Sequence, residues 1–345
     1  MATKIYIPQK IDPFNTHLKN LVEAYKTLQV DILVGYENFL DATFIPDVIH
    51  FHMLEGLLSF LKYDNKLFFK QLDFFQSKGV RFIQTAHNVL PHISIKQLNF
   101  EEVYRRYLHY IFMVVHHGSA SKEILITKFP ELSQKKHIVC HHGDYLSDMK
   151  QFNENYFQAR VKLALPQERK IILVFGQLQY KNTSFAMDVF TNIRSKHPEA
   201  FLILAGVNPV FRFNKLNKIY YKINNTVFNR FRKDRLHLHQ RFSQYETYLL
   251  FKAADVIFLP HNSGLTSGII PLSATLGKPF IYPRIGVFEE QAENCLSEKY
   301  DPGNIVSASD ALNKIIHADI HDFDNSEWML NNNWGVHAKK ILSNL

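Results

Sequence analysis

The sequence lacks most features that mark a secreted or membrane-spanning protein. It has only two cysteines in 345 residues, Cys140 and Cys295, too few for a disulfide framework or a CxxC metal site. No stretch reaches the roughly 18 consecutive apolar residues that a transmembrane helix needs. The first residues lack the charged start and apolar core of a signal peptide. We therefore expect a cytoplasmic protein, with the inner face of the membrane as its alternative location.

Composition and charge are typical of a folded globular protein. Hydrophobic residues make up 46% of the chain and charged residues 21%, which is too apolar for a disordered chain. A length of 345 residues exceeds what one hydrophobic core usually supports, so we expect two domains. The net charge of +8 favours anionic partners, namely nucleotide phosphates, lipid headgroups or nucleic acid, without choosing among them.

Short apolar runs alternate with longer amphipathic segments, as in βαβ units on a parallel sheet. In the first half we predict strands over residues 4–8, 31–34, 48–51, 80–85, 111–115 and 137–140, and helices over 16–28, 54–77, 100–109 and 119–128. In the second half we predict strands over 170–175, 200–205, 236–238, 256–259, 279–282 and 304–306, a helix over 183–196 and a helical tail over 325–345. A polar, irregular stretch over 146–168 separates the two series.

The predicted fold class is α/β, with two Rossmann-like doubly wound parallel-sheet domains facing a cleft. We place the first domain at residues 1–155 and the second at residues 165–325. The C-terminal helix, residues 326–345, crosses back to the first domain or caps the second. Open sheets of this kind bind ligands beyond the carboxyl ends of their strands. The loops at these ends are therefore the candidates for function.

The most informative loop follows the predicted strand 256–259. It contains Thr266, Ser267 and Gly268 and leads into a helix that begins near Ile270. Small residues between a strand and a helix let backbone N–H groups converge, and the helix N-terminus adds partial positive charge. The segment therefore predicts a phosphate-binding site in the second half of the chain.

A second candidate loop follows the predicted strand 170–175 and includes Gly176, Gln177 and Lys181. Lys181 stands close to the start of the next helix, where its ammonium can bind a phosphate as a point charge. A lysine at such a position is commonly an ordinary surface residue. Its occurrence together with the Thr266–Gly268 loop favours the phosphate-binding interpretation.

Two histidine-containing loops follow strands in the first half. His87 and Asn88 follow the fourth predicted strand, where a histidine can hydrogen-bond a sugar hydroxyl or take a proton. Because the chain has 18 histidines, an ordinary loop role is the alternative. His142 and Gly143 follow the sixth strand, and Gly143 either lets the backbone approach a ligand or makes a turn. Neither an HExxH motif nor a regularly spaced carboxylate accompanies His141 and His142, so we predict no metal site.

Basic and aromatic residues alternate over residues 211–241. A basic aromatic face can rest on an anionic membrane. The same pattern is typical of an amphipathic helix that packs its aromatic residues inward, and this second case is the more common. Peripheral membrane contact is therefore one of two interpretations of this segment.

Several of these segments resemble the GT-B glycosyltransferases, in particular the large retaining family that uses nucleotide sugars. The family's G-R-x-x-x-x-K-G element is similar to GQLQYKN at residues 176–182, and its A-x-D-V-x-x-x-P strand to AADVIFLP at residues 253–260. Its G-x-P-V-I…G-G-x-x-E segment is similar to GKPFI at residues 277–281, followed by Gly286 and Glu289. Weaker similarities in the first half extend the resemblance over nearly the whole chain.

The chain departs from this family at the acidic donor-binding positions. The family commonly has two glutamates around the small-residue loop, and Gly264 and Leu272 occupy these positions here. Gln177 replaces the usual arginine. We therefore assign the chain to a branch that has a Thr-Ser-Gly loop in place of the paired glutamates.

The resemblance implies an enzyme that moves a sugar from a nucleotide sugar, of UDP or GDP type, to a glycan or lipid-linked acceptor. It implies retention of configuration, no metal and no other cofactor, and a place in bacterial surface polysaccharide synthesis. His87, beside the sugar, and Lys181, at the departing nucleotide, are the implied catalytic residues. The implied donor-binding residues are Gly176, Gln177, Lys181, Glu246, Thr266, Ser267 and Gly268, and the implied acceptor-binding residues are Asn15, Asn88, His142 and Tyr145.

Two further interpretations stay open. The missing glutamates also fit an inactive sugar-nucleotide-binding subunit that supports a partner enzyme. The positive charge also fits a nucleic-acid-binding protein, but no recognised nucleic-acid-binding motif is present. We accordingly predict no nucleic-acid partner.

Overall fold

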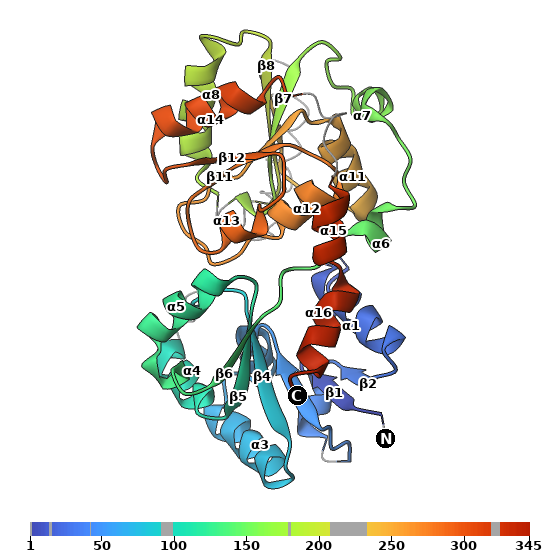
Figure 1. Cartoon of the computed structure of the whole chain (residues 1–345), viewed down its shortest axis with the longest axis vertical. Helices are drawn as coiled ribbons and strands as arrows, with labels where there is room; N and C mark the ends of the chain where they lie inside the picture. The colour runs from blue at the N-terminus through green and yellow to red at the C-terminus, as the bar shows by residue number, and fades with distance from the viewer. Residues whose placement is uncertain are drawn as a thin grey trace. The chain divides into compact units, whose positions relative to one another are not determined.

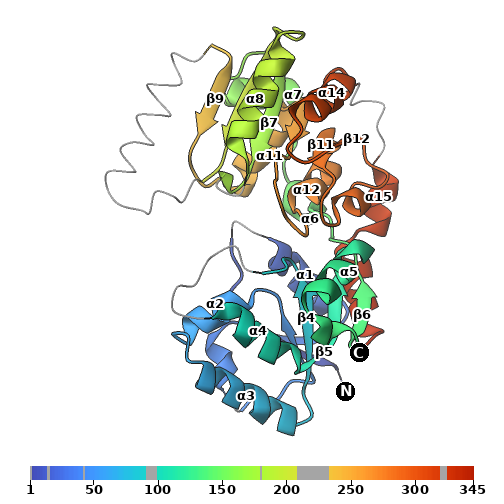
Figure 2. The same cartoon turned by 90° about the vertical axis from the view of Figure 1, so that its left-hand side faces the viewer.

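The computed structural model describes residues 2–13, 16–41, 43–90, 99–178, 181–207, 233–318 and 325–345. The chain forms two compact units. Unit 1 comprises Met1–Gly143 and Asn332–Leu345, and unit 2 comprises Asp144–Asn331. Each unit is built on a six-stranded sheet with helices on both faces (Figures 1 and 2). The predicted fold class, α/β with two Rossmann-like parallel-sheet domains, is confirmed.

All neighbouring strands of unit 1 pair in parallel, in the order β2-β1-β3-β4-β5-β6. The chain runs from β1 to β2 on one side and from β3 outward on the other, so its direction changes between β1 and β3. The strands are β1 (Lys4–Ile7), β2 (Asp31–Val34), β3 (Val48–Phe51), β4 (Arg81–Ala86), β5 (Ile111–His116) and β6 (Lys136–Val139). The helices are α1 (His17–Thr27), α2 (Leu54–Phe60), α3 (Asn65–Ser77), α4 (Phe100–Leu108), α5 (Ser119–Lys128) and α16 (Trp334–Leu342), with 3-10 turns η1 (Glu37–Leu40) and η2 (Pro130–Leu132).

The strands of unit 1 are apolar on both sides because helices cover both faces of the sheet. On one face α1 and α16 lie side by side (Figure 1), and Trp334 and Ile341 join Ile5 and Ile7 in one core cluster. On the other face the ring of Phe51 contacts Tyr107 of α4, with ring centroids 5.3 Å apart. The C-terminal helix α16 is thus part of the hydrophobic core of unit 1.

The strands of unit 2 are also parallel, in the order β12-β11-β10-β7-β8-β9. The chain direction changes between β7 and β10, which are neighbours. The strands are β7 (Lys170–Phe175), β8 (Ala200–Ala205), β9 (Arg235–Leu238), β10 (Val256–Phe258), β11 (Phe280–Pro283) and β12 (Ser297–Tyr300). The helices are α6 (Leu146–Met149), α7 (Tyr156–Lys162), α8 (Thr183–Arg194), α11 (Gln244–Ala253), α12 (Ile269–Thr275), α13 (Phe288–Gln291), α14 (Ile305–Ile315) and α15 (Ser326–Asn331).

Alternation along β7 divides the core of unit 2 into two clusters. Ile171 and Leu173 pack with residues of α11 and α12. Ile172 and Val174 point the other way and pack with residues of α8 and α14. Successive side chains of a strand point to opposite faces, so one apolar run serves both layers of helices.

Three sequence predictions about elements are wrong. The predicted strand 304–306 is the start of α14, with the Asn304 side chain as its N-cap, and the last strand is β12. β12 is polar (SEKY) and gave no apolar run. The predicted helix 54–77 is two helices, because Lys62 and Tyr63 have positive φ angles of 52° and 62°. The stretch 146–168, expected to be irregular, contains α6 and α7.

None of the helices in the described residues is long and apolar enough to span a bilayer. The basic aromatic segment 211–241 lies for the most part outside the described residues. Its predicted membrane contact therefore stays a prediction.

Candidate functional site

The loops after β7 and β10 lie together in unit 2 because these two strands are neighbours. Asn182 joins the loops: its N–H donates to the Pro260 carbonyl (2.7 Å) and its side-chain amide to Asn262 Oδ1 (2.9 Å). Asn182 Oδ1 also accepts from the Phe185 N–H (3.0 Å) as the N-cap of α8. The two loops predicted to bind a phosphate thus meet where the chain direction changes, which is the usual ligand site of an open α/β sheet.

Lys181 is a cationic residue at this edge of the sheet. Its Nζ is hydrogen-bonded to His261 Nε2. A Cβ atom added to Gly176 would lie 3.6 Å from Lys181 Cε and 3.9 Å from Ile269 Cδ1, so Gly176 lies near both side chains. Burial lowers the pKa of Lys181 to about 7. An anion in contact with this amine would favour its charged form.

Gly206 has no space for a side chain because the backbone of Gly176 is close. Gly176 has a φ of 114° and Gly206, at the end of β8, a φ of 155°. A Cβ atom on Gly206 would lie only 1.6 Å from the Gly176 carbonyl oxygen. Side chains are excluded at Gly206, and this fixes the loop that carries Lys181.

The loop of Thr266, Ser267 and Gly268 precedes α12 as predicted, but one of its amides is already engaged. The Ser267 N–H donates to Gln291 Oε1 over 3.0 Å. The Ile269 N–H donates to Ser267 Oγ over 3.3 Å. Contrary to the prediction, the Ser267 amide does not face an open position. Gln291 comes from α13, and no local sequence signal indicated this contact.

Two other predicted residues lie in unit 2 with clear local contacts. The Tyr145 N–H donates to Thr275 Oγ1 (3.0 Å), and a Cβ atom on Gly268 would lie 3.1 Å from the Tyr145 hydroxyl. Tyr145, predicted to bind the acceptor, therefore lies beside the loop of Thr266, Ser267 and Gly268, which was predicted to bind phosphate. Glu246, predicted to lie near the base or ribose, accepts from the Ser243 N–H (2.8 Å) in the capping box of α11. Gln177 is exposed.

Histidines from five segments gather at the carboxyl edge of the sheet in unit 1. His17 begins α1, His52 follows β3, His87 follows β4, His117 follows β5, and His142 lies beyond β6. The ring of His17 lies 4.8–5.7 Å, centroid to centroid, from the other four rings. We call these five residues the histidine cluster. Burial, reinforced by neighbouring histidines, lowers the pKa of His87 to about 3, so its imidazole is neutral at pH 7.

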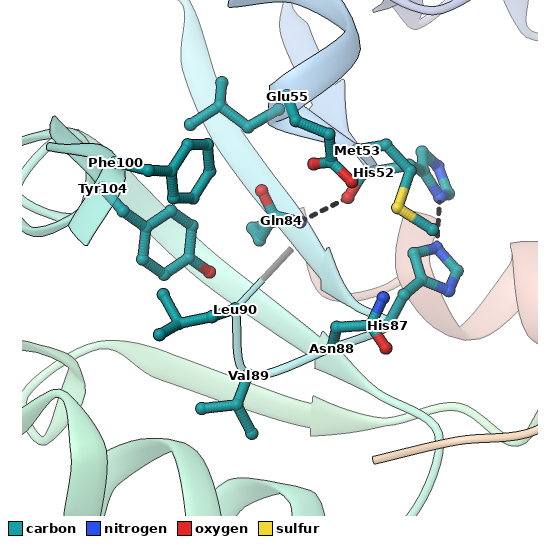
Figure 3. A pocket seen from close by; sticks show the side chains of 11 residues that line it. His52, Met53, Glu55, Gln84, His87, Asn88, Val89, Leu90, Phe100 and Tyr104 are labelled. Atoms are coloured by element: carbon teal, nitrogen blue, oxygen red, sulfur yellow. Dashed lines mark hydrogen bonds between the residues drawn. The ribbon is translucent and has the colours of Figure 1, made fainter. Parts of the chain in front are cut away.

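The histidine cluster borders a small pocket in unit 1 (Figure 3). His52 and His87 lie on one side of it, joined by a hydrogen bond of 3.0 Å, and Phe100 and Tyr104 on another. Gln84 donates to the His52 carbonyl over 3.0 Å. The other lining residues are Met53, Leu54, Glu55, Asn88, Val89 and Leu90. The pocket thus combines aromatic faces with hydrogen-bonding groups, and it includes the predicted residues His87 and Asn88.

The remaining predicted residues of unit 1 have other surroundings. Both ring nitrogens of His142 have partners, His17 Nδ1 (3.0 Å) and the Gly143 carbonyl (2.7 Å). A Cβ atom on Gly143 would lie 2.3 Å from Trp334 Cδ2, so this glycine makes room for the indole of α16 rather than for a ligand. Asn15 lies outside the described residues. The sequence analysis missed His17, His52 and His117 because no short motif joins residues from separate strands.

A comparison with family models identifies the chain. The model described as glycosyl transferases group 1 matches residues 155–333, which is more than half of the chain. The chain belongs to the glycosyl transferases group 1 family. The matched part of this family member contains both loops described above, with Lys181 and Thr266–Gly268.

Solved structures of similar fold cover nearly the whole glycosyltransferase chain. Sucrose-phosphate synthase from Thermosynechococcus elongatus has a TM-score of 0.69 at 14% identity, covering 99% of this chain and 98% of that one. Anabaena HepE in complex with UDP and glucose has a TM-score of 0.66 at 14% identity, covering 100% and 99%. An α,α-trehalose-phosphate synthase (UDP-forming) from Burkholderia vietnamiensis has a TM-score of 0.69 at 12% identity, covering 99% and 96%. No curated protein matches the sequence. At these identities the likeness shows the shared fold.

Proposed function

We propose that this glycosyltransferase moves a sugar from a nucleotide sugar to a glycan or lipid-linked acceptor, with retention of configuration, in bacterial surface polysaccharide synthesis. The observation that carries the proposal is the position of Lys181. Its Nζ is hydrogen-bonded to His261 of the β10 loop, where the β7 and β10 loops of unit 2 meet, within the part that matches the family. A buried amine at such a place supplies the charge that a nucleotide diphosphate needs.

Lys181 would stabilise the diphosphate most strongly during cleavage of the donor. When the bond between the sugar and the diphosphate breaks, the bonding electrons stay with the diphosphate, which gains negative charge. An ammonium fixed beside that oxygen stabilises the charge without rearrangement of water. We propose that Thr266 and Gly268 contact the same phosphates. Ser267 could add its amide only after Gln291 Oε1 moves away.

A uridine nucleotide is the donor type we favour. HepE has been solved in complex with UDP-glucose, and its structure matches 100% of this chain with a TM-score of 0.67 at 15% identity. The trehalose-phosphate synthase is named as UDP-forming. These are properties of the neighbours, and they support UDP as the first nucleotide to test.

We propose that the pocket of unit 1 binds the acceptor. Phe100 and Tyr104 offer apolar ring surfaces, while His87, Asn88 and Glu55 offer hydrogen-bonding groups. This combination suits a saccharide, which has both apolar C–H faces and hydroxyl groups. Neutral His87 can exchange a hydrogen bond with a hydroxyl but carries no extra proton to deliver.

Nucleotide binding by calorimetry tests the donor site. UDP, GDP, ADP and TDP are titrated into the wild type, Lys181→Gln and Thr266→Trp, with the exposed Lys196→Gln as the matched control. We expect wild type and K196Q to bind UDP alike. K181Q should bind about 10- to 100-fold more weakly, because hydrogen bonds to charged groups contribute about 1.5–3 kcal/mol. Unchanged affinity in both site variants would remove the donor site from unit 2.

The inactive binding subunit is the second candidate. Gly264 and Leu272 occupy the positions of the two family glutamates, and Leu272 is 6% exposed within the core of unit 2. An acidic group is therefore missing at both positions. Slow hydrolysis of UDP-glucose by the purified protein would contradict this candidate. Tight UDP binding with no hydrolysis and no transfer would favour it over the enzyme.

A further inference from the structure

We propose that His17, His52 and His87 form a site for a transition-metal ion of the Zn²⁺ type in unit 1. One ring nitrogen of each residue lies within 4.8 Å of the chosen nitrogens of the other two. Zn–N bonds of about 2.0–2.1 Å place the nitrogens of a tetrahedral site about 3.3–3.4 Å apart. The three nitrogens must therefore move closer together to bind one ion.

Hydrogen bonds determine which nitrogen of His17 can bind a metal. His142 Nδ1 lies 2.7 Å from the Gly143 carbonyl, which can only accept, so Nδ1 carries the proton of this imidazole. His142 Nε2 must then accept, and its partner at 3.0 Å, His17 Nδ1, must donate. The lone pair of His17 is therefore on Nε2. A metal-binding histidine usually donates its other ring N–H in this way.

His52 gives the second, independent observation. The residue is buried, with an exposed fraction of 6%. Within the described residues, its Nε2 has no hydrogen-bond partner. Its other nitrogen, Nδ1, lies 3.0 Å from His87 Nε2 and is the donor when Nε2 holds the lone pair. The lone pair of His87 is then on Nε2, and this hydrogen bond must open for His87 to bind the same ion. A buried polar atom without a partner destabilises a fold by about 1–3 kcal/mol. Coordination of a metal at Nε2 would satisfy it.

His117 is oriented as a further ligand. Its Nδ1 donates to the Cys140 carbonyl over 3.0 Å, which leaves the lone pair on Nε2. That Nε2 is buried and has no hydrogen-bond partner within the described residues. The ring of His117 lies 5.2 Å from that of His87 and 5.7 Å from that of His17. His117 can therefore complete a four-nitrogen site, or the fourth position can hold water or an anion.

A second group of this kind lies on the surface of unit 2 and serves as a control. His197, Glu199 and His317 also place ligand atoms within 4.8 Å of one another. His317 is exposed, and His197 Nε2 already bonds Asn313 Oδ1 over 3.0 Å. The group lacks the buried, pre-oriented lone pairs of unit 1, so any metal bound there should be held weakly.

The metal site shares His52 and His87 with the pocket proposed for the acceptor, but it is independent of the proposed donor site. Its residues belong to unit 1, whereas Lys181 and the small-residue loop belong to unit 2. Metal content, rather than turnover, is the measurement. A protein that binds UDP but no metal would refute this inference alone, and the reverse result would refute the donor site alone.

The test is a Zn²⁺ titration by calorimetry on the full chain after treatment with a chelator. We expect one tightly bound ion per chain. That ion should be retained when both His197→Ala and His317→Ala are present, and it should bind more than about 100-fold more weakly in His17→Gln, because even loss of an outer partner costs about 10- to 100-fold. His52→Gln should behave like H17Q. Wild-type Zn²⁺ affinity in both H17Q and H52Q, or loss of the ion in the surface variant, would overturn the proposal.

X-ray absorption of the Zn²⁺-loaded wild type tests the site without any substitution. We expect at least three imidazole ligands around the ion. Fewer than three imidazoles, or no bound ion in the wild type, would overturn the proposal even if H17Q and H52Q fail to fold.

Discussion

Lys181 Nζ and His261 Nε2 are hydrogen-bonded across the loops that follow β7 and β10. The two residues are 80 positions apart in the sequence and come together because their strands are neighbours. An ammonium has no lone pair, so the imidazole accepts and Lys181 is directed along a defined line. The donor-binding proposal depends on this orientation.

The affinity for UDP should fall as the pH rises above about 7. Burial lowers the pKa of Lys181 to about 7 in the unliganded protein. Below this pH the ammonium is already present, and diphosphate binding needs no proton. Above it the amine is neutral, so binding must take up a proton, and the affinity decreases by up to about tenfold per pH unit. Calorimetry at several pH values measures this, and Lys181→Gln should show no such decrease.

His87→Ala should separate turnover from donor affinity. The His87 imidazole lines the pocket of unit 1 and is neutral at pH 7. We expect kcat to fall about 100-fold, the usual scale for the loss of a hydrogen-bonding group at a reacting centre. UDP affinity should change less than about twofold. The exposed His109→Ala is the matched control, and near-normal kcat in H87A would remove His87 from the mechanism.

Asp255→Ala should strongly destabilise unit 2. Arg160, 0% exposed, donates to Asp255 Oδ2 over 2.6 Å, and the same oxygen accepts from the Ile171 N–H over 2.6 Å. Removing one partner leaves a buried charge, which costs about 3–5 kcal/mol. Asp301→Ala breaks the exposed pair with Arg284 and should cost less than about 1 kcal/mol.

Urea unfolding can follow unit 2 by itself. The chain has two tryptophans, Trp328 in unit 2 and Trp334 in unit 1. In a Trp334→Phe background, the fluorescence of Trp328 reports unit 2. If D255A and D301A unfold at the same urea concentration, the Arg160–Asp255 pair does not stabilise unit 2 as predicted.

Gly206→Ala should destabilise unit 2 and weaken UDP binding. The new Cβ would lie 1.6 Å from the Gly176 carbonyl oxygen, so the backbone that leads to Lys181 must shift. Gly303→Ala is the matched control, because Gly303 also has a positive φ, 74°, but has nothing within 4 Å of the new atom. We expect G206A to be less stable than G303A by about 1–3 kcal/mol, the usual penalty of overpacking. Equal stabilities in urea would refute the close approach.

Much of the fold could be predicted from local patterns alone. Apolar runs such as Ile171–Val174 predict strands wherever helices bury both faces of a sheet, and the helix predicted over residues 183–196 is α8, with Asn182 as its N-cap. β12 escaped prediction because its position at the edge of the sheet tolerates polar residues. The break between α2 and α3 was not predicted, because nothing in the residue types of Lys62 and Tyr63 indicates their positive φ angles.

The sequence by itself determined the strand–helix alternation, the two loops of unit 2 and the family resemblance, because each depends on residues that are close along the chain. Three features depended on the tertiary structure alone. Gln291 accepts a hydrogen bond from the Ser267 N–H, Gly143 makes room for Trp334, and five histidines meet in unit 1. The histidines meet because of the order of the strands, and the other two contacts are made by helices α13 and α16. Strand order is set by packing between distant segments, which no local pattern contains.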